Sequence, residues 1–341
     1  MKEAMFYESD GSTVRCGLCR FRCSIRPGSR GICGVRENVD GVLYTLVYGK
    51  AVAGNADPIE KKPLFHVLPG SRSYSIATAG CNFRCLHCQN HSISQVSAGD
   101  ARIVGHDLPP ERVVQEALDA GCSSISYTYT EPTIFFEYAL ETARLARERG
   151  LLNIFVTNGY ITPEALACIA PYLDAANIDL KGFSDRFYRE VVHAMREEVL
   201  DCILDYRKHG IWIELTTLLI PGFNDSREEV EATASFIAEK VGVETPWHVS
   251  AFFPTYRLHA RPTPPETLLR AREAGLQAGL RYVYTGNIPG EGGEDTFCAG
   301  CGARVIARHG YRVGSNRLAG DACAACATPM DGIFRNETTR R

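Results

Sequence analysis

Three cysteines within eight residues are the part of the chain best suited to chemistry. Cys81, Cys85 and Cys88 are separated by three and then by two residues. Thiolates at this spacing can hold three irons of a four-iron cluster, because such clusters are ligated by cysteine. A cluster held by only three cysteines keeps one iron open, and an open iron can bind and activate a small molecule. The run therefore predicts a reactive [4Fe-4S] centre rather than a closed electron carrier.

Zinc is the alternative metal for this run. His91 lies shortly after Cys88, and three thiolates with one imidazole are adequate ligands for tetrahedral zinc. The position of the run favours iron, because the run follows the first strand of a predicted barrel-like repeat, where chemistry is expected. A carboxylate, an amide and an Asp/Lys pair recur at the ends of later strands. Their placement supports a catalytic site.

Two cysteine pairs near the C-terminus form a second candidate metal site. Twenty-one residues separate the pair Cys298 and Cys301 from the pair Cys323 and Cys326, and each pair has two residues between its cysteines. This pattern predicts a zinc ribbon, in which zinc holds together a small hairpin module that lacks a core of its own. A rubredoxin-like iron centre and a pair of unligated knuckles are the alternatives.

Four further cysteines near the N-terminus form a third candidate site, composed of Cys16, Cys19, Cys23 and Cys33. Four closely spaced thiolates suit either tetrahedral zinc or an auxiliary iron–sulfur cluster. The arginines around them would stabilise a negatively charged centre of either kind, so they do not discriminate. We favour zinc and keep the cluster as the alternative.

The composition is that of a soluble globular protein. The chain has 341 residues, of which 45% are hydrophobic, enough for one large domain of about 200–250 residues with smaller appendages. A formal net charge of -3 supplies no broad cationic field. We therefore expect no nonspecific binding to nucleic acid or to a membrane surface.

We expect the protein to be cytoplasmic. Polar positions follow the first five residues, so no signal peptide is identified. No apolar run approaches the roughly 20 residues of a membrane-spanning helix. Fourteen cysteines without a secretory signal indicate thiolates kept reduced for metals rather than disulfides.

Short apolar runs alternate with amphipathic stretches from residue 73 onward, which predicts strand–helix units around a parallel sheet. The predicted strands are Ser73–Thr78, Ser123–Tyr129, Asn153–Thr157, Ala175–Lys181, Trp212–Leu218 and Trp247–Phe253, with Tyr282–Thr285 as a possible seventh. The predicted helices are Pro110–Ala120, Thr133–Arg149, Pro163–Ala170, Glu198–Lys208, Ser226–Lys240 and Pro265–Ala278.

Such units predict an α/β fold with a partial (β/α)6 TIM-like barrel, and a doubly wound open sheet is the alternative. Reactive residues of these barrels lie after the carboxyl ends of strands, and the notable polar residues of this chain do follow its predicted strands. The predicted domains are a Cys-rich N-terminal module at 1–70, the core at 71–290 and a zinc-ribbon-like module at 291–341.

The chain resembles the radical SAM superfamily over about residues 73–285, specifically the branch that contains pyruvate formate-lyase activating enzyme. The motifs that carry this resemblance are Cys81-x3-Cys85-x2-Cys88 followed by Gln89-Asn90, Glu131-Pro132, Thr157-Asn158-Gly159, Asp179-Leu-Lys181 and Ile220-Pro-Gly-Phe-Asn-Asp225. Within that branch it is most similar to the AmmeMemoRadiSam-system radical SAM enzymes, by Cys16-Gly-Leu-Cys19, by the stretch from Asp57 to His66 and by the C-terminal cysteine pairs.

The resemblance implies an enzyme that cleaves S-adenosylmethionine (SAM) reductively. The resulting 5′-deoxyadenosyl radical abstracts hydrogen from a substrate. The run at 81–88 is implied to ligate the cluster, and an electron donor such as flavodoxin or ferredoxin is implied as a partner. Thr130 and Glu131 are implied to meet the methionine amino group, Asn158, Asp179 and Lys181 to contact SAM or the substrate, and His248 to lie near SAM. From this resemblance we predict Asp179, Lys181 and His248 as catalytic residues.

Each implied role has a structural alternative. Glu131 could cap the helix that follows Pro132, and Asn158 before Gly159 is a common turn signal. Asp179 and Lys181 could form an ion pair at the top of the barrel, and His248 could be a core histidine. Two positions depart from the family pattern: Tyr129 and Thr130 replace glycines before the glutamate, and His87 replaces an aromatic residue before the last cysteine.

The substrate is open at this level. A glycyl residue of a partner protein is the first hypothesis, by analogy with activating enzymes, and a small metabolite or another protein side chain is the second. The extra cysteines lie at the two ends of the chain rather than directly after the run, unlike those of many activating enzymes, which weakens the first hypothesis. A hypothesis of another class is a zinc-dependent binding module in which all three cysteine groups bind zinc.

Overall fold

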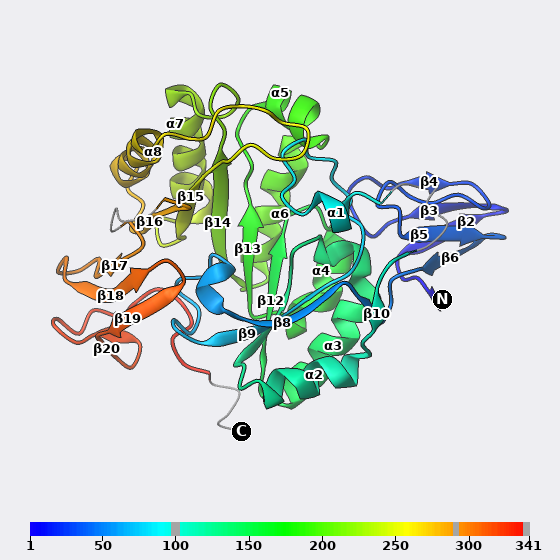
Figure 1. The fold of residues 1–341 in the computed structure, drawn as a ribbon, viewed down its shortest axis with the longest axis horizontal. Coiled ribbons are helices and arrows are strands. Elements are labelled where there is room, and N and C mark those ends of the chain that lie inside the picture. The colour runs from blue at the N-terminus through cyan, green and yellow to red at the C-terminus, as the bar shows by residue number, and fades with distance from the viewer. Residues whose placement is uncertain (97–102, 289–292, 337–341) are drawn as a thin grey trace.

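An eight-stranded sheet forms the centre of the molecule (Figure 1). The computed structural model describes residues 1–96, 103–288 and 293–336. The order of the strands is β16-β15-β14-β13-β12-β11-β9-β8. Their bounds are β8 (Ala53–Pro58), β9 (Arg72–Ala77), β11 (Ser124–Tyr127), β12 (Leu152–Thr157), β13 (Ala175–Asp179), β14 (Trp212–Leu219), β15 (Trp247–Ala251) and β16 (Val283–Gly286).

The sheet is mostly parallel. Every neighbouring pair from β9 to β16 runs parallel, and β8 pairs with β9 in the antiparallel direction. The α/β class and the six predicted strands are confirmed, and the possible seventh strand is present as β16. Nearly all side chains of β11 and β12 are buried, as expected of parallel strands that are covered on both faces. Closure into a partial barrel stays a prediction.

Helices connect the successive strands and flank the sheet from α2 and α3 at one end to α7 and α8 at the other (Figure 1). Their bounds are α2 (Pro110–Asp119), α3 (Phe136–Glu148), α4 (Pro163–Ile169), α5 (Asp185–Phe187), α6 (Arg196–Lys208), α7 (Arg227–Phe236) and α8 (Pro265–Gln277). Proline begins α2, α4 and α8, where its missing N–H costs nothing. The hydroxyl of Ser226 caps α7 by accepting the N–H of Glu229. The six predicted helices are confirmed.

Two small antiparallel sheets precede the core and lie at one flank of it (Figure 1). Their strands are β1 (Lys2–Glu3), β2 (Tyr7–Asp10), β3 (Thr13–Cys16), β4 (Ser24–Ile25), β5 (Arg36–Val39) and β6 (Val42–Thr45). A further two-stranded sheet joins β7 (Lys50–Ala51) to β10 (His106–Asp107). Strand β8 lies within the predicted module 1–70 and is also the edge strand of the core sheet. The predicted division at residue 70 stays a prediction.

The C-terminal strands lie at the opposite flank (Figure 1). They are β17 (Thr296–Phe297), β18 (Arg304–His309), β19 (Arg312–Asn316), β20 (Leu318–Ala319) and β21 (Ala322–Cys323). The guanidinium of Arg308 donates to the carbonyl of Phe65 at 2.7 Å, so this region is fastened to the segment before the core. The predicted boundary at 290/291 lies outside the described residues.

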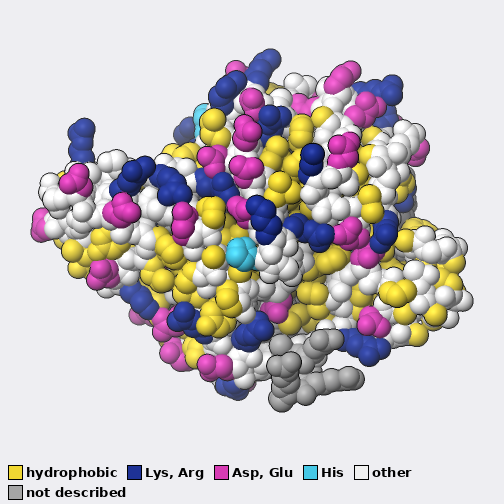
Figure 2. Space-filling view, turned by 180° about the vertical axis from the view of Figure 1, so that it is seen from behind, with side chains coloured by type: hydrophobic (Ala, Val, Ile, Leu, Met, Phe, Trp, Pro, Cys, Tyr) yellow, Lys and Arg dark blue, Asp and Glu magenta, His cyan; other side chains and the backbone are white. Residues whose placement is uncertain are grey.

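Acidic and basic side chains intermingle over the face seen in Figure 2. This face therefore carries no continuous field of one sign, in agreement with the small net charge. Within the described parts of the chain, no helix is long and apolar enough to cross a membrane.

Candidate active site at the cysteine run

The cysteine run occupies the loop between β9 and the short helix α1 (His91–Ser94), at the carboxyl end of the first parallel strand. Cys85 is buried, and Cys81 and Cys88 are half-buried. Gly80 enters the run with a φ of +98°, and a Cβ atom there would lie 2.7 Å from Val35. Glycine is therefore required where the loop passes the N-terminal region.

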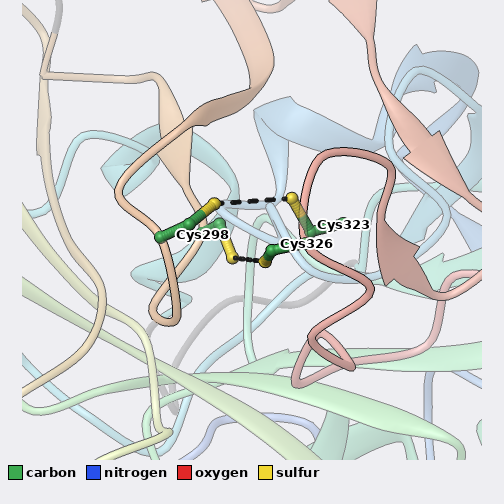
Figure 3. Close-up of side chains that lie close together, drawn as sticks. Cys298, Cys323 and Cys326 are labelled. Atoms are coloured by element: carbon green, nitrogen blue, oxygen red, sulfur yellow. Dashed lines mark hydrogen bonds between the residues drawn. The ribbon is translucent and has the colours of Figure 1, made fainter.

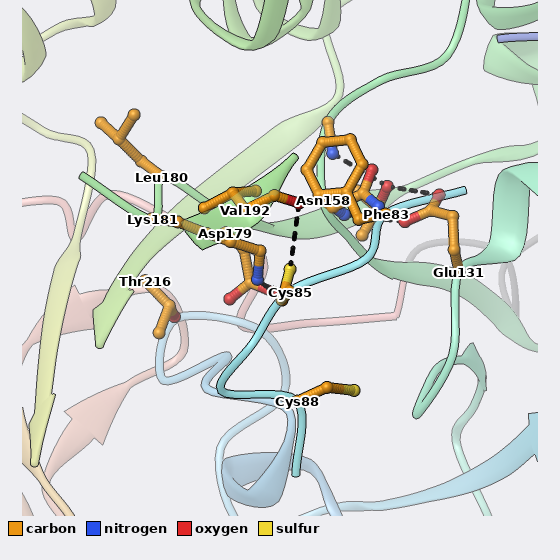
Figure 4. Close-up of polar contacts among 12 residues, drawn as sticks. Phe83, Cys85, Cys88, Glu131, Asn158, Asp179, Leu180, Lys181, Val192 and Thr216 are labelled. Carbon is orange, nitrogen blue, oxygen red and sulfur yellow. Dashed lines mark hydrogen bonds and ion pairs between the residues drawn. The ribbon is translucent and has the colours of Figure 1, made fainter. Parts of the chain in front are cut away.

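The three sulfurs of the run have different neighbours. The sulfur of Cys85 lies 3.8 Å from the carbonyl oxygen of Val192 (Figure 4), and that of Cys88 lies 3.1 Å from the hydroxyl of Ser94. Among the described residues, the set of four ligand atoms gathered within 4.8 Å of one another is the C-terminal one and not this run. The run is thus not preformed around a single ion.

His91 is engaged elsewhere, which counts against the zinc alternative. Its imidazole stacks on Tyr256 with 4.6 Å between ring centroids, and its Nδ1 lies 3.3 Å from the carbonyl oxygen of Cys88. The histidine therefore does not complete a ligand set with the three thiols.

A cavity of about 430 Å³ opens above the run. All three cysteines line it, together with the other predicted contact residues at the strand ends, Thr130, Glu131, Asn158, Asp179 and Lys181. This volume lies in the range of ligand pockets. The structure thus brings residues from the ends of four strands to one place, as the parallel sheet predicts.

Glu131 joins two of these strand ends (Figure 4). Its buried carboxylate accepts hydrogen bonds from the N–H of Thr133 at 3.0 Å, from the hydroxyl of Thr157 at 2.8 Å and from the N–H of Asn158 at 2.8 Å. Burial raises the pKa of Glu131, although these hydrogen bonds act in the opposite direction. The bond to Thr133 caps the turn η2 (Pro132–Phe135), so the capping alternative is observed as well.

Three buried polar atoms beside the run lack a hydrogen-bond partner within the described structure. They are Nδ2 of Asn82, Nδ1 of His87 and Oδ1 of Asn158. The Nδ2 of Asn158 is used, since it donates to Oδ1 of Asn82 at 2.8 Å. Unsatisfied polar atoms are rare in protein interiors and call for a partner. Their gathering at the cysteine run fits a site built for a bound group.

Asp179 and Lys181 form an ion pair at the cavity, with 2.9 Å between Oδ2 and Nζ. Burial alone would lower the pKa of Lys181, but Asp179 and Cys85 outweigh it and raise that pKa. The ammonium therefore stays charged. The ion-pair alternative is thus observed, and both partners also face the cavity.

His248 lies elsewhere. Its side chain is buried, Nε2 lies 2.7 Å from Oε2 of Glu214, and its ring stacks on Tyr284. Ser250, two residues further along β15, is the one that lines the cavity. This geometry favours the core-histidine alternative over a catalytic role.

His87 replaces the expected aromatic residue and remains buried. It lines the cavity and stacks on Phe187 with 6.1 Å between centroids. Burial, and then the charge of Lys181, lowers the pKa of His87 to about 3. The ring is therefore neutral and can pack against an apolar or aromatic group.

Three residues that the sequence analysis did not assign also line the cavity: Lys61, Tyr129 and Tyr311. Tyr129 takes a φ of +64°, the left-handed conformation that glycine favours at this position. Lys61 belongs to the Asp57–His66 stretch, which was noted only for its resemblance. Tyr311 lies in the turn between β18 and β19, and no local signal links it to the cysteine run.

The four C-terminal sulfurs face one another in two pairs (Figure 3). The sulfurs of Cys298 and Cys326 are 3.6 Å apart, and those of Cys301 and Cys323 are 3.9 Å apart. Four thiolates at about 2.3 Å from a tetrahedral zinc would stand about 3.8 Å from one another. The observed separations match a single tetrahedral metal ion.

The N-terminal cysteines lie mostly in the interior, and two of them are joined through their backbones. Cys16, Cys19 and Cys33 are buried, and Cys23 is half-buried. Cys16 donates its N–H to the carbonyl of Cys23 at 2.9 Å. Burial raises the pKa of Cys33 to about 11. The group lies in and around β3, and which metal it holds stays a prediction.

Comparisons with known proteins also point to the radical SAM superfamily. The family model of the radical SAM superfamily matches residues 75–237. An uncharacterized protein of Methanocaldococcus jannaschii is 45% identical over 338 residues, which are 98% of this chain and 100% of that protein. The pyruvate formate-lyase-activating enzyme of Clostridium pasteurianum is 21% identical over 182 residues, 52% of this chain and 73% of that enzyme.

A solved structure shares the fold. It is that of Streptococcus suis SuiB bound to S-adenosylmethionine, which matches with a TM-score of 0.50 and 15% identity. The match covers 67% of this chain and 53% of SuiB. At this level of identity the likeness concerns the architecture alone.

Proposed function

The chain belongs to the radical SAM superfamily, and from that premise we propose that it cleaves SAM reductively and abstracts hydrogen from a substrate. The observation that carries the proposal is the convergence of the cysteine run and the polar strand ends on one cavity. A zinc-dependent binding module would not need a cysteine run and polar strand ends around one cavity.

Cys81, Cys85 and Cys88 would hold the cluster. Bound there, a [4Fe-4S] cluster supplies the electron that splits SAM into methionine and the 5′-deoxyadenosyl radical. The unpartnered atoms of Asn82 and Asn158 beside the run support this fit, because they lack partners within the protein.

The residues of the chain would bind and orient SAM. Glu131 holds the backbone of Asn158 in place by its hydrogen bond, and Oδ1 of Asn158 has no hydrogen-bond partner within the described structure. The Asp179–Lys181 pair offers an acceptor and a donor at another wall of the cavity. Fixed partners of this kind lower the entropic cost of bringing the reacting groups together.

The two terminal cysteine groups would be structural metal sites. The 3.6 and 3.9 Å sulfur separations support zinc in a ribbon at the C-terminus. For the N-terminal group we propose zinc, and an auxiliary iron–sulfur cluster is the alternative. Iron and zinc content of anaerobically purified protein decides between them.

The substrate would be either a glycyl residue of a partner protein or a smaller group, namely a metabolite or another protein side chain. Sequence similarity to an activating enzyme supports the first. Lys61 and Tyr311 also line the cavity, and they come from the two terminal regions of the chain. Their polar and aromatic side chains favour the second hypothesis, because such walls suit a small ligand.

Anaerobic reconstitution, followed by dithionite and SAM, tests the function. We expect a brown protein with about four irons per chain at the run and formation of 5′-deoxyadenosine. The triple variant Cys81→Ala, Cys85→Ala, Cys88→Ala should lose both. An intact cluster that never yields 5′-deoxyadenosine would refute the enzyme, and a colourless protein that contains zinc at all three sites would support the binding module instead.

A further inference from the structure

Lys61 and Tyr129 line the cavity, and they belong to a cluster of charged and polar side chains that reductive cleavage of SAM does not require. It consists of Asp57, Lys61, Lys62 and Tyr129, which we call the lysine cluster. We propose that Lys61 of this cluster binds an oxyanion of the substrate, a carboxylate or a phosphate group. This inference rests on the proposed function of the cavity.

Asp57 is the centre of the lysine cluster. Its Oδ1 lies 2.8 Å from Nζ of Lys61, and its Oδ2 lies 2.8 Å from Nζ of Lys62. The hydroxyls of Ser75 and Tyr129 also donate to Oδ2. A carboxylate has about four acceptor positions, so Asp57 has nearly all of its capacity in use within the protein.

The lysine cluster holds more positive than negative charge. Two ammonium groups face one carboxylate, which leaves one positive charge in excess. Lys62 is 1% exposed and does not line the cavity, whereas Lys61 is 39% exposed and does. The group that can meet a ligand is therefore Lys61.

If the lysine cluster only stabilised the fold, it would not need both lysines. One ammonium group suffices to neutralise Asp57, and a second ammonium group held beside it can form a charge-assisted hydrogen bond to another anion. Lys62 already performs the neutralising role from the buried side. The second lysine, Lys61, keeps its ammonium group partly exposed on the cavity side, where it can meet a ligand that carries negative charge.

The lysine cluster adjoins the cysteine run. The carbonyl of Tyr129 accepts a hydrogen bond from the side-chain amide of Asn90 at 2.7 Å, and Asn90 lies two residues after Cys88. The side chain of Tyr129 is fixed at its other end by Asp57. These contacts hold a non-glycine residue in the left-handed conformation, which is uncommon for a bulky side chain. An oxyanion at Lys61 would thus lie in the cavity where the radical forms.

Two sources can supply an oxyanion here: the substrate and the carboxylate of SAM itself. Both would be recognised by the same ammonium group, because charge-assisted hydrogen bonds depend on the oxyanion and not on its carrier. We assign the site to the substrate, since Asp179, Lys181 and the strand ends already provide the contacts proposed for SAM.

Binding of inorganic phosphate and of succinate to the reconstituted, anaerobic protein tests the proposal. We expect Lys61→Gln to weaken the binding of either probe by about tenfold or more, since a hydrogen bond to a charged group contributes about 1.5–3 kcal/mol. Lys61→Arg should restore binding. Lys208→Gln is the matched control, because Lys208 is 73% exposed on α6 and pairs with an aspartate. The dissociation constant of SAM should stay the same in all three variants.

A second measurement needs no variant. Site-resolved acylation of the wild-type protein with acetic anhydride should modify Lys61, and phosphate should protect it while leaving Lys208 reactive. The proposal is overturned if neither probe binds at millimolar concentration, if Lys61→Gln leaves their affinity unchanged, or if that variant weakens SAM by the same factor as the probes. The last result would assign Lys61 to SAM. Formation of 5′-deoxyadenosine by the wild-type protein is scored separately, so loss of the proposed function is distinguished from failure of this inference.

Discussion

The carboxylate of Glu131 accepts the backbone N–H of Asn158 at 2.8 Å, and this bond joins the carboxyl end of β11 to that of β12. Both residues line the cavity above the cysteine run. A buried carboxylate that receives only N–H and O–H donors cannot be replaced by an amide without a mismatch, because an amide carries a donor of its own.

Glu131→Gln should therefore weaken both folding and SAM binding. The new NH2 group would face the N–H of Asn158 or a donor from Thr133 or Thr157. An unsatisfied buried group costs about 1–3 kcal/mol. Urea denaturation and the dissociation constant of SAM measure the two effects. Glu148→Gln, at the exposed end of α3, is the control. Unchanged stability would show that the carboxylate is not the link between these strands.

Lys181→Met should weaken SAM binding while the cluster stays intact. The variant removes the ammonium group that pairs with Asp179 at 2.9 Å. A lost charge-assisted hydrogen bond corresponds to about tenfold in affinity. Equilibrium binding of SAM to the reconstituted protein measures the change, and iron content verifies the cluster. Full SAM affinity in this variant would contradict the proposed role of the pair.

His248→Phe should affect stability and not chemistry. The variant removes one partner of the buried Glu214 carboxylate, which lies 2.7 Å from the imidazole and also accepts the N–H groups of Phe65 and His66. Because its other donors remain, we expect a loss of about 1–3 kcal/mol of stability. The yield of 5′-deoxyadenosine per correctly folded protein should remain that of the wild type. A variant of normal stability that makes no 5′-deoxyadenosine would restore the catalytic role predicted for His248.

Replacing Cys301 and Cys326 together by serine should remove about one zinc per chain and leave the iron at the run unchanged. Both cysteines are exposed, and each has a partner sulfur within 3.9 Å. Metal analysis measures the result. Cys168→Ser, outside the three cysteine groups, should keep every metal. If iron falls together with zinc, the C-terminal site is not an independent structural centre.

Stability should fall as the pH decreases from about 6.5 to about 4, in part because of His66. Burial lowers the pKa of His66 to about 4 in the folded protein, so its imidazole is neutral there. The unfolded chain binds a proton below its ordinary pKa of about 6.5, and it is therefore favoured at lower pH. The contribution of His66 is fully present above 6.5, and about 3 kcal/mol is lost by pH 4.

Urea denaturation at several pH values checks this expectation. His66→Phe should show a flatter dependence between pH 6.5 and 4 than the wild type. His209→Asn, at an exposed position, should keep the wild-type slope. Equal slopes in the wild type and His66→Phe would mean that the folded protein accepts the proton on His66.

Local patterns in the sequence were enough to predict the α/β class, the strands, the helices and the cysteine run. The alternation of apolar runs with helical periods reports which face of each element is buried, and this is a local property. Because parallel strands end at the same edge of a sheet, the convergence of Glu131, Asn158 and Asp179 also followed from the sequence.

Only the tertiary structure shows where the side chain of His248 lies and which residues line the cavity. His248 and Ser250 lie on the same face of β15, yet the histidine is two residues, or about 7 Å, deeper and meets Glu214 instead of the cavity. Lys61 and Tyr311 reach the cavity from regions far apart in the chain. Contacts between residues so far apart in the sequence depend on how distant elements pack. No local periodicity of the sequence predicts them.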